Sequence, residues 1–182
     1  MDTDSNHGLT TRAVDVERIE TPRLILRPPV FSDAEIVYEL LSNPEISRFS
    51  PHSPLGTVAD ANFVILGWRE AVERGTRTYV GAIQGSPREA IGFVHVGPDE
   101  ELGGLLAPAK SGQGLATEGL EAIISTLRLR NAWTIIDAEN APLIYTLAKV
   151  NIKQDKILPA YRVHPHISSE KRDCVLLRQR SS

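Results

Sequence analysis

Apolar residues recur every three or four positions in four stretches of the chain, which is the spacing of a helix with one buried face. These stretches predict helices over residues 32–43, 57–73, 117–130 and 142–150. The first should open with a capping box, in which Ser32 and Glu35 each bond to the other's backbone N–H group. The second should end at Gly75, because glycine readily adopts the left-handed conformation that closes a helix.

Short runs of β-branched and aliphatic residues lie around these helices, and each predicts a strand. The runs cover residues 24–26, 78–83, 91–96, 102–106, 133–137 and 174–177. Gly85, Ser86 and Pro87 separate the second run from the third, which is typical of a hairpin. Residues 1–18 are polar and aperiodic, and we expect a flexible lead-in there. This order of elements predicts a single α/β (α+β) domain over residues 19–182.

Composition narrows the class of protein. The chain has 182 residues, which suits one domain, and a formal net charge of -3, which provides no basic field for nucleic acid. Cys174 is the only cysteine, so we expect a small buried hydrophobic side chain and no disulfide within the chain. No apolar run approaches the ~18 residues of a membrane span, and the acidic N-terminus is unlike a signal peptide. We therefore expect a cytoplasmic protein with neither a nucleic-acid nor a membrane partner.

The segment from Glu101 to Leu120 carries the most specific chemistry. A strand here leads into a glycine-containing turn that opens an amphipathic helix. Gly112 and Gly114 permit a tight turn and close approach to a ligand, and free N–H groups at a helix start attract phosphate oxygens. The turn lacks the Gly-Lys-Ser/Thr of a Walker loop and the Gly-x-Gly-x-x-Gly of a dinucleotide site. On the glycine spacing alone, a plain strand-to-helix turn stays an alternative.

The whole segment resembles the GNAT N-acetyltransferases, in particular the branch that acetylates N-terminal amines of ribosomal proteins, together with its small-molecule relatives. That branch shows a Glu-apolar-Gly-aromatic-aromatic-Leu-x-Pro strand followed by Gly-x-Gly-x-Ala-Thr-Glu. The matching residues are Glu101, Gly103, Leu106, Pro108, Gly112, Gly114, Ala116, Thr117 and Glu118. Weaker similarity at residues 21–27, 32–44, 140 and 172–173 extends the resemblance over roughly residues 19–179.

The resemblance implies a mixed, twisted β-sheet that splays apart near its middle, with helices on both faces and acetyl-CoA as acetyl donor in the splay. The backbone of Leu106 and Ala107 would hold the pantetheine arm, and Asn140 would contact the cofactor from the opposite side. The amides that would hold the pyrophosphate are those of Gly112, Gln113, Gly114, Leu115, Ala116 and Thr117. No metal is expected, because His164 and His166 lack acidic or cysteine neighbours in sequence and should lie in an exposed loop.

The implied reaction is attack of a neutral amine on the thioester, which needs a proton acceptor. Glu101 is the first candidate for the base, and Glu100 is the second. Strand alternation points these neighbours to opposite faces, so only one can face the cleft. The family's usual proton-donor positions hold Leu143 and Leu147, which cannot donate, and Tyr145 should pack elsewhere on its helix.

The acceptor would be the primary amine of a protein N-terminus or of a small molecule, and the protein a monomer or homodimer. Several departures from the family pattern leave open a module that binds CoA without turnover, and a purely structural interaction domain stays a more distant alternative. Ser111 replaces a pyrophosphate contact, and Asn151 replaces a glycine. Gly104 and Leu105 replace aromatic residues, which could widen the acceptor pocket. The link from Leu127 to Trp133 is also short.

Overall fold

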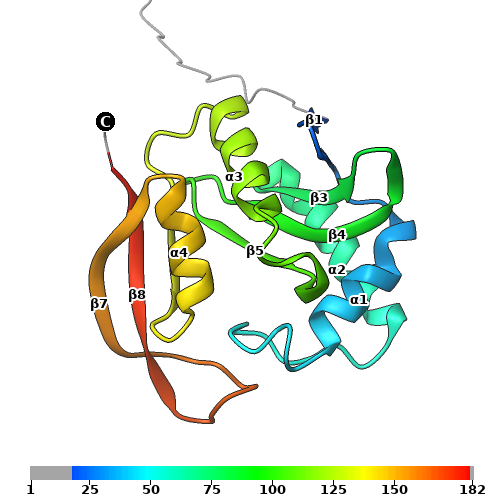
Figure 1. Cartoon of the computed structure of the whole chain (residues 1–182). Coiled ribbons are helices and arrows are strands. Elements are labelled where there is room, and N and C mark those ends of the chain that lie inside the picture. Colours follow the sequence, from blue (N-terminus) through cyan, green and yellow to red (C-terminus); the bar gives the residue numbers. More distant parts are fainter. Residues whose placement is uncertain (1–17, 181–182) are drawn as a thin grey trace, which may run out of the picture.

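The computed structural model describes residues 18–180, apart from the side chains of residues 87–89. The expected lead-in, residues 1–18, therefore lies almost entirely outside the described residues. Five strands form an antiparallel sheet in the order β1-β2-β3-β4-β5 (Figure 1). They are β1 (Ile19–Glu20), β2 (Leu24–Arg27), β3 (Arg77–Ile83), β4 (Ser86–Val96) and β5 (Leu102–Leu106).

A second antiparallel sheet of three strands follows in the order β6-β8-β7. Its strands are β6 (Trp133–Asp137), β7 (Ile152–Val163) and β8 (Lys171–Gln179). A single parallel bridge between Glu101 and Trp133 connects the two sheets at the beginning of β5 and β6. Beyond that bridge β5 and β6 no longer pair, which is the splay that the sequence predicted.

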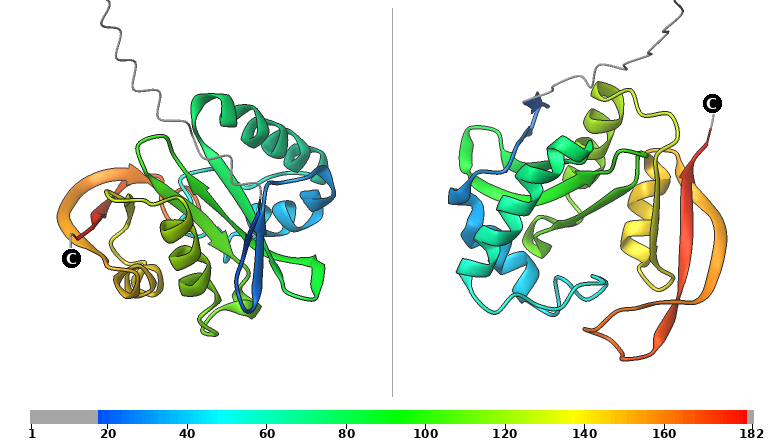
Figure 2. Two further views of the ribbon diagram at one scale, coloured as in Figure 1. Left: turned by 90° about the horizontal axis from the view of Figure 1, so that it is seen from above. Right: turned by 180° about the vertical axis from the view of Figure 1, so that it is seen from behind.

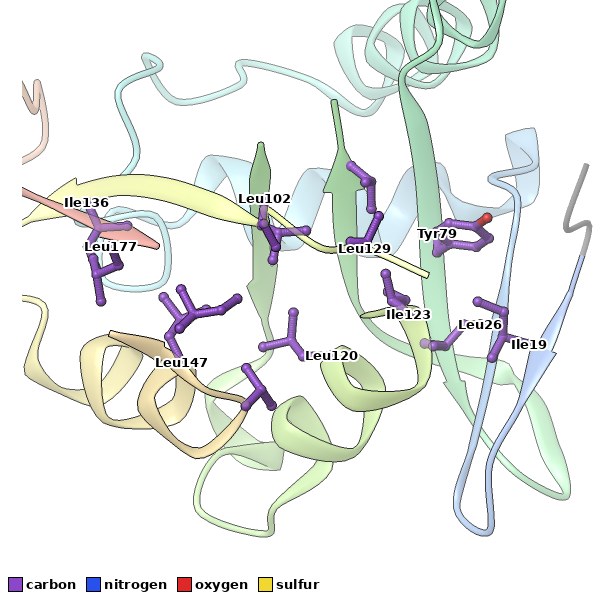
Figure 3. Close-up of a cluster of buried hydrophobic side chains, with 14 of the residues drawn as sticks. Ile19, Leu26, Tyr79, Leu102, Leu120, Ile123, Leu129, Ile136, Leu147 and Leu177 are labelled. Atoms are coloured by element: carbon purple, nitrogen blue, oxygen red, sulfur yellow. The ribbon is translucent and has the colours of Figure 1, made fainter. Parts of the chain in front are cut away.

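Four α-helices cover the two faces, with α1 and α2 on one side of the sheets and α3 and α4 on the other (Figure 2). They are α1 (Ala34–Ser42), α2 (Val58–Glu70), α3 (Leu115–Thr126) and α4 (Ala141–Lys149), with short 3₁₀ turns at Phe31–Asp33, Ala71–Arg74 and Pro108–Lys110. The main core joins α3 and α4 to strands of both sheets through residues such as Leu26, Leu102, Ile123, Leu147 and Leu177 (Figure 3). Within residues 18–180, no helix is both long and apolar enough to span a bilayer.

The predicted capping box at Ser32 is wrong. The carboxylate of Asp33, and not the Ser32 hydroxyl, closes the turn by accepting from the N–H of Val30 at 2.9 Å. Arg27 holds the same carboxylate through two hydrogen bonds of 2.8 and 2.7 Å. A capping box does form at the next helix, where Thr57 and Asp60 exchange side-chain and backbone contacts. The buried aspartate with its arginine partner thus determines where the first helix begins.

Candidate active site

One edge of β5 is free for an extended ligand. The N–H of Ala107 donates to the carbonyl of Ile91 on β4 at 2.7 Å. In an antiparallel pair such bonds alternate, so every second residue of β5 turns its N–H and C=O away from β4. Gly104 and Leu106 are those residues, and their backbone groups face the splay beside β6 without a backbone partner among the described residues.

Ala107 does not share this property. Its N–H is taken by Ile91, and its carbonyl accepts from the N–H of Lys110 at 2.9 Å. The prediction that Leu106 and Ala107 both offer backbone groups to a pantetheine arm is therefore corrected: the free groups belong to Gly104 and Leu106. The short 3₁₀ turn that follows Ala107 uses the carbonyl that was expected to be available.

Gly104 owes its place to the close approach of β4. A Cβ at position 104 would overlap the carbonyl oxygen of Phe93, and a Cβ on Gly92 would overlap the carbonyl oxygen of Leu105. The absence of an aromatic residue at position 104 therefore reflects tight contact between two strand backbones. The predicted widening of the acceptor pocket does not follow from this glycine, because its missing side chain leaves no open volume.

The glycine turn forms a row of unpaired amides at the start of α3. Gly112 and Gly114 both adopt left-handed conformations, with φ of 74° and 77°. From Gly112 to Thr117, no backbone N–H donates to a backbone acceptor in the described part of the chain, and the first amide to do so is that of Glu118. Unpaired N–H groups at the positive end of a helix bind anions. The residues named from the sequence therefore carry unpaired amides, and phosphate binding by them stays a prediction.

Arg23, which immediately precedes β2, lies against this turn. Its guanidinium donates to the carbonyl of Gln113 at 2.8 Å and to the carboxylate of Glu118 at 2.6 Å. Glu118 also accepts from the hydroxyl of Thr21 at 2.5 Å. Burial opposes ionisation of Glu118, but the hydrogen bonds from Thr21 and Arg23 outweigh it and lower the pKa of this carboxyl group. Arg23 thus brings a half-exposed positive charge to the edge of the row, where Ser111 supplies none.

The two candidate bases have separate positions, but Glu100 lies in the turn before β5 with a left-handed φ of 67°, so the expected strand alternation is not the reason. Glu100 accepts from the backbone N–H groups of Arg130 and Asn131 at 2.9 and 2.5 Å. Its carboxylate therefore fixes the short link between α3 and β6, and this engagement argues against Glu100 as a base. Glu101 is exposed. Its neighbour Leu102 packs in the core with α3 and α4, so strand alternation places Glu101 on the opposite, α1–α2 face.

His95 on β4 lies on the same face and was not singled out from the sequence. Its Nδ1 is 2.8 Å from the hydroxyl of Thr78 on β3. The rings of Trp68 and Phe93 lie 4.9 and 5.1 Å from the imidazole, centroid to centroid. Burial, and to a smaller extent the nearby His52, lowers the pKa of His95 to about 4. The imidazole is therefore neutral near pH 7. No local sequence pattern marks His95, because its lowered pKa depends on neighbours from other parts of the chain.

Asn140 caps α4 from the end of β6. Its side-chain oxygen accepts from the N–H of Leu143 at 3.3 Å, so this oxygen is already used within the chain. Tyr145 does not pack in the core as expected: it is 66% exposed, and the ammonium group of Lys149 lies over its ring. The hydroxyl of Thr146 donates to the carbonyl of Pro142. Helix α4 therefore directs no free hydroxyl group of its own toward the splay.

A buried ionic cluster anchors the turn that leads to Asn140. Arg172 on β8 donates to the carboxylate of Asp137 at 2.7 Å and lies 2.8 Å from that of Glu139. Burial disfavours the Asp137 carboxylate, but the bond from Arg172 outweighs this and lowers its pKa. His164 packs beside Asp137 and is 1% exposed, so the prediction that it lies in an exposed loop is wrong.

Cys174 completes this cluster. It is buried, as predicted, and its sulfur lies 3.8 Å from Nε2 of His164. Burial raises the pKa of the thiol, so the group stays protonated near pH 7. In residues 18–180, no three histidine, cysteine or acidic side chains gather in a way that could hold a metal ion. The cluster thus joins the end of β6, the start of β8 and the residue after β7 at one end of the smaller sheet by packing and charge.

Two loops meet on the α1–α2 side. The ring of His166, between β7 and β8, donates from Nε2 to the carbonyl of His52 at 3.1 Å and lies 3.3 Å from the hydroxyl of Ser47.

Asn151, which stands where the family has glycine, adopts the left-handed conformation with φ of 62°, and its side chain donates to the carbonyl of Arg180 at 2.7 Å. This departure from the pattern therefore preserves the local backbone.

Comparison with known proteins agrees with the fold and the turn. A sequence model of the family described as Acetyltransferase (GNAT) domain matches residues 23–153. An uncharacterised N-acetyltransferase p20 from Bacillus licheniformis is 24% identical over 156 residues, which cover 80% of this chain and 88% of that protein.

Solved structures show the same arrangement of elements. Mycobacterium smegmatis RimJ in complex with CoA-disulfide superposes with a TM-score of 0.72 at 20% identity, over 85% of this chain and 80% of that one. The spermidine N-acetyltransferase from Vibrio cholerae, in complex with CoA and spermine, superposes with a TM-score of 0.73 at 15% identity, over 87% and 95%. With the family match covering most of the chain, this protein belongs to the GNAT acetyltransferase family and is an acyltransferase.

Proposed function

We propose that this GNAT protein transfers an acetyl group from acetyl-CoA to the primary amine of a protein N-terminus or of a small molecule. The observation that carries the proposal is the continuity between the free edge of β5 at Gly104 and Leu106 and the row of unpaired amides from Gly112 to Thr117. An extended amide arm followed by a diphosphate matches that order of donors and acceptors. The complexes of the RimJ and spermidine acetyltransferase neighbours with CoA compounds support it.

Each part of the donor has a place in this arrangement. The N–H and C=O groups of Leu106 would pair with the pantetheine amides as a strand would. The amides of Gly112 to Thr117 would surround the pyrophosphate, and Arg23 would add its charge at the edge. Asn140 would meet the donor from the β6 side through its amide nitrogen, since its oxygen caps α4.

The chemistry requires that the amine lose a proton as its nitrogen bonds to the acetyl carbon and the C–S bond breaks. Glu101 is the proton acceptor that the geometry favours, because Glu100 is held by the loop before β6. The N–H of Gly104, which faces the splay, would stabilise the developing negative charge on the carbonyl oxygen. The leaving thiolate would take its proton from water, since α4 directs no free hydroxyl group toward it.

The alternative is a module that binds CoA without turnover, and the lack of a proton donor on α4 motivates it. Thermal unfolding with and without acetyl-CoA, followed by thiol release with spermidine or an alanine-initiated peptide, separates the two. Ligand at 100 times its Kd stabilises a folded domain by about 2.7 kcal/mol, which raises Tm by roughly 5–10 °C at this size. A rise with thiol release supports the transferase. A rise without release supports the binding module. If acetyl-CoA neither raises Tm nor releases thiol, both hypotheses are rejected.

A further inference from the structure

We propose that the imidazole of His95 contacts the acceptor amine and orients its lone pair toward the thioester, in a position directly above Gly103. This inference rests on the proposed transferase function, and it assigns an amine-binding group on β4 in addition to the base on β5.

The register of the two strands places His95 beside the splay. His95 is the direct partner of Gly103, and Gly97 is the partner of Glu101. Directly opposed residues share a face of the sheet, so His95 and Glu101 project to the same side. They are diagonal neighbours across one antiparallel pair, a relationship that separates two residues by about 7–8 Å and their Cβ atoms by somewhat less. A small amine fits between two groups at that spacing.

Gly103 provides the room between them. A Cβ at position 103 would come within 4.0 Å of Cδ2 of His95, and no other heavy atom would be as close. Nε2 is bonded directly to Cδ2, so the outer nitrogen of the imidazole is one bond away from the ring atom nearest to this glycine. Any larger residue at position 103 would fill the space that the amine requires.

The outer nitrogen of His95 is available. Nδ1 is occupied by Thr78, while Nε2 has no hydrogen-bond partner among the described residues and is not one of their fully buried, unpartnered atoms. Solvent therefore reaches Nε2, although Trp68 and Phe93 enclose the rest of the ring. With Nδ1–H donating to Thr78, Nε2 carries a lone pair that accepts a hydrogen bond from an amine N–H.

This arrangement divides the work between two residues. Nε2 of His95 holds one N–H of the neutral amine, and the carboxylate of Glu101 accepts the proton that the nitrogen loses after its bond to the acetyl carbon forms. His95 gains no proton in this scheme. Burial disfavours a positive charge at this position, which also favours the neutral and reactive form of the bound amine.

Two variants distinguish the contribution of Nδ1 from that of Nε2. His95→Asn keeps a polar atom near the Nδ1 position and removes Nε2, whereas His95→Gln places its terminal amide near the Nε2 position. With spermidine and an alanine-initiated peptide as acceptors, we expect His95→Asn to lower kcat/KM for the amine about tenfold. His95→Gln should stay within about threefold of the parent, and the Kd for acetyl-CoA should be unchanged in both.

Three results would overturn the inference. An unchanged kcat/KM in His95→Asn would show that Nε2 touches nothing in the reaction. Equal losses in both variants would assign His95 a packing role between Trp68 and Phe93. A parent protein that transfers acetyl to neither amine would reject the proposed function first and this contact with it, and that failure is recognised without any variant.

Discussion

The carboxylate of Glu118 accepts hydrogen bonds from both the backbone N–H and the Nε of Arg23, at 2.9 and 2.6 Å. These residues are 95 positions apart, and their contact joins the first turn of α3 to the beginning of β2. Arg23 also donates to the carbonyl of Gln113, so one side chain contacts both the glycine turn and the helix that follows it. Arg23 therefore ties the glycine turn and the first turn of α3 to the segment just before β2.

Removing this arginine should weaken donor binding selectively. Arg23→Ala should raise the KM for acetyl-CoA about tenfold, because it removes a positive charge and loosens the turn. The KM for acetyl-pantetheine, which has no diphosphate, should change little. Arg18→Ala is the matched control, since Arg18 forms only an exposed pair with Glu20. Equal losses for both donors would show that Arg23 stabilises the fold and does not serve the phosphate site.

The amide row makes a second prediction at Gly114. Aspartate and asparagine both tolerate left-handed backbone, so Gly114→Asp and Gly114→Asn differ mainly in charge. Gly114→Asp should weaken acetyl-CoA binding at least tenfold more than Gly114→Asn, because its carboxylate opposes the diphosphate. Calorimetric titration measures both Kd values. Equal affinities in the two variants would place the diphosphate elsewhere.

The neighbouring glutamates should respond differently to the same substitution. Glu101→Gln should lower kcat roughly 100-fold with little change in Kd for acetyl-CoA, as expected when a general base is lost. Glu100→Gln should leave kcat near the parent value and lower the free energy of unfolding by about 1 kcal/mol, because it weakens bonds to the N–H groups of Arg130 and Asn131. Full activity of Glu101→Gln over the whole pH range would remove Glu101 as the base.

His95 makes stability depend on pH. Its pKa in the folded protein is about 4, below the ordinary value of 6.5, so the unfolded chain binds the proton more tightly. No penalty exists above pH 7, and stability falls as the pH decreases from about 6.5 toward 4. The loss at pH 4 is at most about 3 kcal/mol. In urea unfolding, the free energy of unfolding of His95→Asn should fall by that much less between pH 7 and pH 4 than that of the parent. An equal dependence of the free energy of unfolding on pH in both proteins would contradict the burial of a neutral ring.

The sequence predicted the elements whose pattern is local. Strand β5 appeared at the expected residues. Helix α3 begins two residues before the expected start and ends at Thr126, four residues before the expected end. Both were found because glycine spacing and helical periodicity lie within one segment. Strand β7 was missed, because most of its side chains are exposed and its run has no alternation of apolar and polar residues. It forms by pairing with β8, which no local pattern reveals.

The remaining site residues depend on contacts between distant segments. Arg23 lies within the weak family similarity at residues 21–27, but its partner Glu118 lies on another element. His95 acquires its character from Thr78, Trp68 and Phe93, which come from a neighbouring strand, a helix and its own strand. Ala107 was expected to be free, and only the register of β4 shows that its N–H is taken.

The central position of β8 has a consequence for biosynthesis. Strands β6 and β7 pair with β8 and not with each other, and β8 follows both of them in the chain. A ribosome therefore releases the five-stranded sheet and the glycine turn well before the smaller sheet can close. Arg172, which fixes the turn before Asn140, arrives with that last strand. A nascent chain stalled before Lys171 would hold the folded glycine turn beside a smaller sheet that still lacks β8. We therefore expect acetyl-CoA binding and acyl transfer to become possible at different stages of synthesis.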